Sequence, residues 1–136
     1  MLTNSIEIAR ILTENSTAEV FVTGGKLRAE HGGVVGSGAR KFIEQFNLHI
    51  AFISAGGIDL VAGLTDYTLD DAEFTRTIIR RAKRSIVLAD HSKFGRRALV
   101  SVCDFHEIDM LITDQVPTDS MYRRLEEEGV TICAGS

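Results

Sequence analysis

The sequence has few of the features that mark secreted, membrane-spanning or metal-binding proteins. Its 136 residues include no tryptophan, one proline and two cysteines. The spacing of Cys103 and Cys133 fits neither a metal site nor a redox motif, so we expect both thiols to stay reduced. No apolar run approaches the ~18 residues of a membrane span, and the first residues do not resemble a signal peptide. We therefore expect a cytoplasmic protein.

The sequence also lacks an excess of positive charge. The formal net charge is −4, with 15 Lys and Arg against 19 Asp and Glu. Binding to nucleic acid relies on a basic surface that neutralises phosphates, and the chain as a whole has none. One basic run falls at the end of a predicted helix, where cations complement the helix dipole: Arg76, Arg80, Arg81, Lys83 and Arg84. We interpret it as a solvated helix face.

What is present is ordinary for one globular domain, with 44% hydrophobic and 25% charged residues. Hydrophobic periodicity predicts alternating strands and helices, with crossovers long enough for parallel pairing. The fold class is therefore α/β: a Rossmann-like, mostly parallel sheet with helices on both faces, in a single domain over residues 1–136. The predicted strands are 1–3, 19–23, 49–54, 85–89, 109–113 and 130–134, with short extended pieces in the segment GGVVGSG and at 63–67. The predicted helices are 4–15, 37–46, 70–84 and 117–127, and residues 97–105 are irregular.

Helix starts are predicted from capping residues. Asn4 followed by Glu7 fits a capping box for the first helix, and Ser37 is placed to cap the second. The strands 49–54 and 85–89 are continuous apolar runs of the kind buried on both faces of a parallel sheet.

The stretch Ser85–Gly95, SIVLADHSKFG, carries the main functional signal. Its apolar strand runs into Asp90, His91, Ser92 and Lys93, and other strand ends finish in Thr23-Gly24-Gly25, Ser54-Ala55-Gly56-Gly57 and Thr113-Asp114. The carboxyl ends of parallel strands share one edge of a sheet, where such folds bind ligands. Lys93 suits a phosphate or carboxylate, and Asp90 suits sugar hydroxyls or Lys93 itself. A small, anionic, hydroxylated ligand such as a sugar phosphate is indicated.

Each of these features also has a purely structural interpretation. Glycines at strand ends usually make turns, an Asp after a strand often caps the next turn, and a single lysine is usually a surface residue. Other chemistries are weaker: there is no P-loop, no dinucleotide motif, and Ser92 has no matched His and Asp. A proton-transfer enzyme would use Asp90, Glu73 or Asp66 as its base. The histidines lack metal-ligand spacing: His31, His49, His91 and His106.

Several segments resemble one family in order along nearly the whole chain. LADHSKFGRRA, the upstream FVTGGKLR, AGGID followed by GLT, the downstream EIDMLITD and the opening LTNSIEIARIL are similar to the C-terminal effector-binding domain of DeoR-family transcriptional regulators. The most specific part is D-x-S-K-F-G after an apolar strand. The resemblance implies a non-catalytic sensor, related in fold to ribose-5-phosphate isomerases and CoA transferases, that binds a phosphorylated sugar without a cofactor. It also implies a homo-oligomer whose DNA affinity depends on a separate winged helix-turn-helix.

By position, the resemblance implies a ligand pocket lined by Asn4, Gly24, Gly56, Gly57, Asp90, Ser92 and Lys93, with Lys93 holding the anionic end. The sequence contains neither the family's winged helix nor its first strand with an Asp-Ser-Gly-Thr-Thr loop, so we expect no direct operator binding and an incomplete pocket. Gly56 stands where many members have an acid, and Thr75 where a lysine is frequent. Two alternatives stay open: an isomerase-like enzyme, or an oligomerisation domain with a vestigial pocket.

Overall fold

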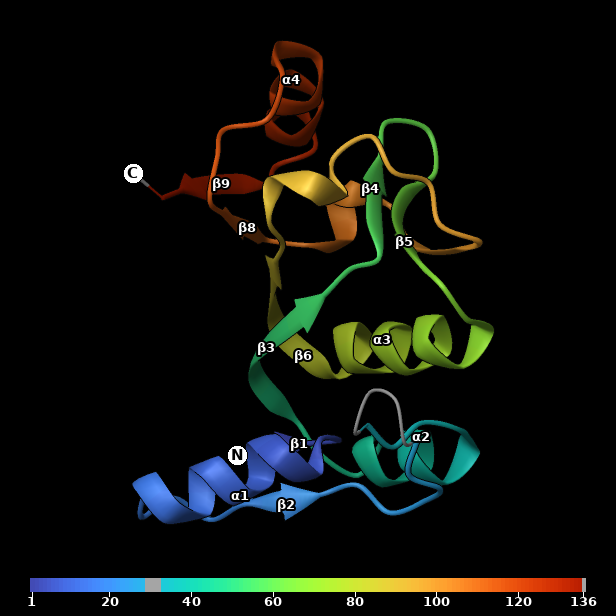
Figure 1. The fold of residues 1–136 in the computed structure, drawn as a ribbon, viewed down its shortest axis with the longest axis vertical. Coiled ribbons are helices and arrows are strands. Elements are labelled where there is room, and N and C mark those ends of the chain that lie inside the picture. Colours follow the sequence, from blue (N-terminus) through green and yellow to red (C-terminus); the bar gives the residue numbers. More distant parts are fainter. Residues whose placement is uncertain (29–32, 136) are drawn as a thin grey trace. The chain divides into compact units, whose positions relative to one another are not determined.

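A computed structural model describes residues 1–28 and 33–135 and divides the chain into two compact units (Figure 1). We call Met1–Phe46 the N-terminal unit and Asn47–Ser136 the C-terminal unit. His31 and Gly32 lie outside the described residues. In the part of the chain that the structure describes, no helix is both long and apolar enough to cross a membrane.

The N-terminal unit holds a two-stranded parallel sheet and two helices. Strand β1 (Leu2–Thr3) pairs with β2 (Phe21–Val22), and helix α1 (Ile6–Asn15) connects them. Helix α2 (Ser37–Ile43) follows. The predicted strand at 19–23 is confirmed in shorter form. The extended piece predicted in GGVVGSG is reduced to isolated bridges from Gly33 and Val34.

Both predicted N-caps of this unit are wrong by one residue. Ser5 caps α1, with its hydroxyl accepting from the Ile8 amide at 3.2 Å. Asn4 cannot serve because its backbone carbonyl and its side-chain amide both bind Val34, at 2.8 and 3.1 Å. Gly36, at φ 103°, is the N-cap of α2, and Ser37 is already helical.

Replacing Ser5 by alanine should therefore lower the free energy of unfolding by about 1 kcal/mol, because the Ile8 amide loses its partner. Ser37→Ala is the matched control, since Ser37 is not the N-cap and the α2 cap has no side-chain hydrogen bond. Urea unfolding followed by circular dichroism measures both. An equal loss in the two variants would contradict this assignment of the caps.

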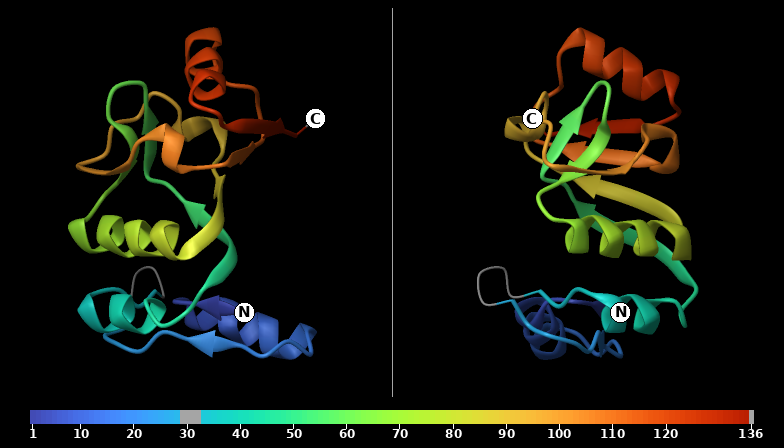
Figure 2. Two further views of the ribbon diagram at one scale, coloured as in Figure 1. Left: turned by 180° about the vertical axis from the view of Figure 1, so that it is seen from behind. Right: turned by 90° about the vertical axis from the view of Figure 1, so that its right-hand side faces the viewer.

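The C-terminal unit is built on a four-stranded parallel sheet in the order β3-β6-β8-β9 (Figure 2). Its strands are β3 (Leu48–Ser54), β6 (Ala82–Leu88), β8 (Met110–Thr113) and β9 (Thr131–Ala134). Helices α3 (Leu69–Arg81) and α4 (Asp119–Glu127) pack against it. The prediction of an α/β fold with a mostly parallel sheet is confirmed. The central core residues include Ile53, Val87, Leu111 and Leu125.

A second, antiparallel sheet lies in the same unit and was not predicted. It has the order β4-β5-β7, with β4 (Gly57–Asp59), β5 (Gly63–Asp66) and β7 (Val100–Cys103). Only β5 matches a predicted extended piece, and β7 falls in the stretch predicted to be irregular. Two 3-10 turns, η1 (His91–Lys93) and η2 (Phe105–Glu107), complete the unit.

Helix α3 passes directly into β6 without a connecting residue. It ends at Arg81, and Ala82 is already extended and pairs with Leu48 of β3. The predicted helix end at Arg84 is therefore wrong, because pairing with β3 draws Lys83 and Arg84 into the strand. The predicted basic helix face is divided as a result. Within it, Arg76 donates to the carbonyls of Ser101 and Val102, both at 3.1 Å.

The strands predicted at 49–54 and 85–89 were expected to be buried on both faces, and this holds for only part of the sheet. Along β3, Ala51 and Ile53 are buried whereas Ile50 and Phe52 are 48% and 63% exposed. In β6, Ser85, Ile86 and Val87 are buried. The apolar side chains of β3 thus alternate between a buried and an exposed face of the sheet.

Candidate functional site

The polar cluster after β6 forms a 3-10 turn held by its own aspartate. The Asp90 Oδ1 atom accepts from the Ser92 amide at 2.8 Å and from the Ser92 hydroxyl. The Lys93 amide donates to the Asp90 carbonyl at 3.1 Å. These hydrogen bonds from Ser92 hold the pKa of Asp90 below its usual range. The capping interpretation of Asp90 is therefore what the structure shows.

A second carboxylate, Asp114, fixes the same turn from the neighbouring strand. It follows β8, which pairs in parallel with β6, so the two strand ends meet at one edge. Its Oδ1 accepts from the His91 amide and its Oδ2 binds the His91 ring Nδ1, both at 2.7 Å. The sequence placed Asp114 at a strand end but gave no sign of this pairing.

Protonation of the pair depends on this contact. The Asp114 hydrogen bond, and then its charge, raise the pKa of His91 above its usual value of 6.5. The hydrogen bond from His91 lowers the pKa of Asp114 in turn. Both groups are about half exposed, so solvent and salt weaken the attraction.

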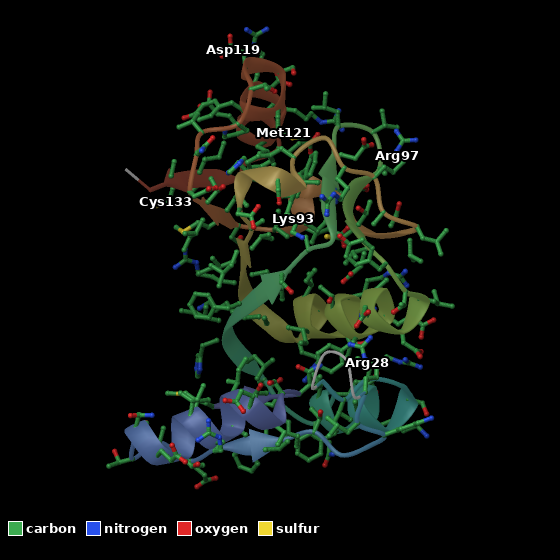
Figure 3. The ribbon with its side chains drawn as sticks, viewed as in Figure 1. Arg28, Lys93, Arg97, Asp119, Met121 and Cys133 are labelled. Atoms are coloured by element: carbon green, nitrogen blue, oxygen red, sulfur yellow. The ribbon has the colours of Figure 1, made fainter. Side chains whose placement is uncertain are left out.

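Lys93 closes the turn and is partly exposed (Figure 3). In residues 1–28 and 33–135 its ammonium makes no hydrogen bond or ion pair, although the nearby Asp90 charge interacts with it. A lysine held on a fixed turn with its donors uncommitted can bind an anion. The Ser92 hydroxyl, by contrast, is already bound to Asp90.

The segment after Lys93 is clamped onto the antiparallel sheet. The Gly95 amide donates to the Ile58 carbonyl at 2.8 Å, and the Ala98 amide donates to the Thr65 hydroxyl at 3.0 Å. Arg96 donates to the Tyr67 hydroxyl at 2.9 Å, which donates to the Gly56 carbonyl at 3.2 Å. The Thr65 hydroxyl also donates to the Gly57 carbonyl at 3.0 Å. We call these hydrogen bonds together the loop clamp.

The predicted glycines Gly56 and Gly57 belong to this clamp. A Cβ atom built on Gly57 would lie 2.2 Å from the Arg96 carbonyl oxygen. At Gly56 it would lie 3.0 Å from the Tyr67 ring. The structure therefore gives both glycines a packing role beside the turn, and brings them together with Asp90, Ser92 and Lys93 in one unit.

Asn4 and Gly24, the other two predicted site residues, lie in the N-terminal unit. Asn4 is occupied by Val34, whereas Gly24 is exposed with open space where a Cβ would be. Next to it, Thr23 is 2% exposed and its hydroxyl has no hydrogen-bond partner among the described residues. Buried hydroxyls normally find a partner, so Thr23 is an unsatisfied polar group beside Gly24, although its burial keeps it from direct contact with a ligand.

One cluster of possible metal ligands and one buried thiol have structural explanations. Asp104, His106 and Glu107 place their ligand atoms within 4.8 Å of one another, but Asp104 and Glu107 form the capping box of η2 and all three residues are exposed. Burial raises the pKa of the Cys103 thiol to about 12, so it stays protonated and is a poor nucleophile.

Comparison with known proteins gives one family. The model of the DeoR C-terminal sensor domain matches residues 1–115. The glycerol-3-phosphate regulon repressor of Haemophilus influenzae is 30% identical over 136 residues, covering 99% of this chain and 53% of the relative. The HTH-type transcriptional repressor GlcR of Bacillus subtilis is 34% identical over 132 residues, covering 97% and 51%. The HTH-type transcriptional regulator GlpR of Haloferax volcanii is 34% identical over 134 residues, covering 98% and 52%. The chain spans about half the length of the curated relatives it matches.

Proposed function

The chain belongs to the family of DeoR C-terminal sensor domains, and from this we propose that it is the effector-sensing part of a transcriptional regulator of carbohydrate metabolism. Its effector would be a phosphorylated sugar or a related small anionic metabolite. The family match identifies a sensor domain rather than an enzyme, and nothing in the comparisons favours an isomerase. Operator binding would belong to a separate winged helix-turn-helix.

One observation carries the proposal: Lys93, whose ammonium makes no hydrogen bond or ion pair within the described residues, lies on a turn that is fixed from several sides. Asp90 holds the turn from within, Asp114 holds it from β8, and the loop clamp holds the segment after it. Because the backbone is already ordered, an anion that binds Lys93 orders little more than the lysine side chain. Rigid support of a charged group is what a binding site needs and what a merely solvated lysine lacks.

A further observation supports a phosphorylated effector. Relatives are named as repressors of a glycerol-3-phosphate regulon, which suggests a phosphate ester of a small polyol or sugar. The proposal includes the remaining predicted contacts of Asn4, Gly56, Gly57, Asp90 and Ser92. We also propose that the protein is a cytoplasmic homo-oligomer that binds neither a membrane nor a cofactor.

The test is the Lys93→Ala variant, with Lys83→Ala as a charge-matched control at the other end of β6. Amide chemical shifts are followed by NMR while glycerol-3-phosphate, hexose phosphates or plain glycerol are added. We expect at least one phosphate, but not glycerol, to shift the amides of residues 90–93. Lys93→Ala should weaken that binding by about tenfold or more, the order of one charged hydrogen bond, and Lys83→Ala should leave it unchanged.

The absence of shifts with every phosphate at millimolar concentration would count against the sensing proposal. Equal weakening by Lys83→Ala would show that binding depends on the overall charge and not on the turn.

A further inference from the structure

We propose that His91 and Asp114 form a pair, here called the latch, whose protonation sets the charge beside the Asp90–Lys93 turn, so that an anion binding at Lys93 is accompanied by proton uptake at His91. The inference rests on the proposed function and adds regulation by pH to the same site. His91 and Asp114 act as positioning residues, because they act on the anion through the turn and through its local charge.

The geometry shows that the latch joins two elements. Asp114 at the end of β8 uses one carboxylate oxygen for the His91 backbone amide and the other for the His91 ring, each at 2.7 Å. The turn that carries Lys93 is thereby tied to the neighbouring strand as well as to its own strand β6. The Ala89 amide, just before the turn, also donates to the Ile112 carbonyl of β8 at 3.1 Å. The backbone bonds fix where the turn lies, and the ring bond adds a group that can change charge.

The charges around His91 explain why its protonation matters for an anion. Asp114 faces it from the end of β8, and Asp90 lies beside it on its own turn. Lys93, on the same turn, interacts with Asp90. With neutral His91 these groups sum to one negative charge, and with protonated His91 they sum to zero. An approaching anion is therefore repelled less when His91 carries its proton.

Thermodynamic linkage between protonation and anion binding requires that each affect the other. If protonation of His91 strengthens anion binding, a bound anion must raise the proton affinity of His91 by the same factor. The pH range in which the ion pair exists follows from the directions of the two pKa shifts. The raised pKa of His91 means that the imidazolium form is favoured in the folded chain below that pKa and is lost as pH rises through it. The lowered pKa of Asp114 keeps its carboxylate charged down to that lower value. The ion pair thus exists in the window between the two.

Above this window the ring can still donate a neutral Nδ1–H to Asp114, so the turn keeps its place. Only the charge next to Lys93 changes. The latch therefore predicts a change in affinity with pH, without unfolding of the turn.

The first measurement needs no effector. The His91 ring is titrated by NMR in the whole chain, in wild type, in Asp114→Asn and in Glu127→Gln, which removes an exposed carboxylate at the end of α4. We expect Asp114→Asn to move the His91 midpoint downward and Glu127→Gln to leave it in place. Circular dichroism confirms that each variant is folded. Equal His91 midpoints in wild type and Asp114→Asn would overturn the latch.

The second measurement uses inorganic sulfate, which keeps its charge from pH 5.5 to 8.5, so any pH dependence of its binding comes from the protein. Sulfate should bind wild type about threefold to tenfold more tightly at pH 5.5 than at pH 8.5, equivalent to a shift of up to about one pKa unit on binding. His91→Asn keeps a donor near the Nδ1 position but cannot titrate, so its affinity should not vary with pH. If the sulfate affinity of His91→Asn varied with pH as strongly as that of wild type, the coupling would be overturned.

Glycerol-3-phosphate is titrated in parallel to separate the two proposals. If neither sulfate nor glycerol-3-phosphate binds at any pH, the proposed function fails and with it the coupling to anion binding, whereas the His91 midpoint still decides whether the latch exists. If both bind with the same pH profile in wild type and in His91→Asn, the function stands and the coupling is overturned.

Discussion

Gly57→Ala is expected to lower the free energy of unfolding of the C-terminal unit by about 3 kcal/mol, at the upper end of the usual cost of overpacking. The added methyl would lie 2.2 Å from the Arg96 carbonyl oxygen and 3.0 Å from the Thr65 hydroxyl. Neither neighbour can move freely, since Arg96 belongs to the clamped loop and Thr65 is completely buried. Chemical denaturation of the whole chain measures the loss.

Gly135→Ala is the matched control, because its Cβ would make only ordinary contacts, the nearest at 3.6 Å. It should change stability by less than about 0.5 kcal/mol. A Gly57→Ala chain as stable as the control would mean that the Arg96 loop adapts, and the loop clamp could not then be the rigid support assigned to it.

Thr65→Val is expected to cost about 3 kcal/mol for a different reason. The Thr65 hydroxyl donates to the Gly57 carbonyl and accepts from the Ala98 amide, both at 3.0 Å. Valine has nearly the same shape but leaves the buried Gly57 carbonyl and the part-buried Ala98 amide without these partners, at a cost of about 1–3 kcal/mol for each group that is shielded from water. The loss should appear in the free energy of unfolding and as faster hydrogen exchange of the Ala98 amide.

Thr131→Val provides the comparison, as Thr131 is an exposed threonine on β9. It should leave stability nearly unchanged. Ala98 exchange that stays slow in Thr65→Val would show that the hydroxyl does not hold the loop.

The sequence was sufficient to predict those strands and helices whose signals are local, such as apolar runs and the residues that begin or end a helix. The strands at 49–54, 109–113 and 130–134 were predicted from short apolar runs, and α4 from Pro117, Thr118 and Gly129. The parallel pairing of β3, β6, β8 and β9 agrees with the parallel crossovers that the alternating pattern predicted. In all of these, propensity and tertiary packing favour the same structure.

The antiparallel sheet escaped prediction because its strands are too short for periodicity. Strand β4 has three residues and begins with Gly57, so its sequence resembles a turn. Its identity as a strand depends on pairing with β5, and its glycine on the approach of Arg96. Neither contact is local in the sequence.

Of the candidate site, only the part that is local in the sequence was predicted. The turn Asp90–Lys93 was found because its residues are adjacent in the sequence. The pairing of His91 with Asp114 joins residues 23 positions apart and depends on the register of β6 against β8. Similarly, Asn4 was predicted as a cap from its residue type, but its contact with Val34 across 30 positions leaves that role to Ser5.

The direct passage from α3 into β6 limits how sequences of this fold can vary in length. A residue inserted between Arg81 and Ala82 has no loop to absorb it, so it would displace β6 by one position against β3 and β8. Buried Val87 would exchange faces with exposed Leu88, and the Lys93 turn would move by about 3.3 Å, the rise of one strand residue. Insertions and deletions should therefore collect at sites such as the hairpin between β4 and β5, and this junction should keep a constant length.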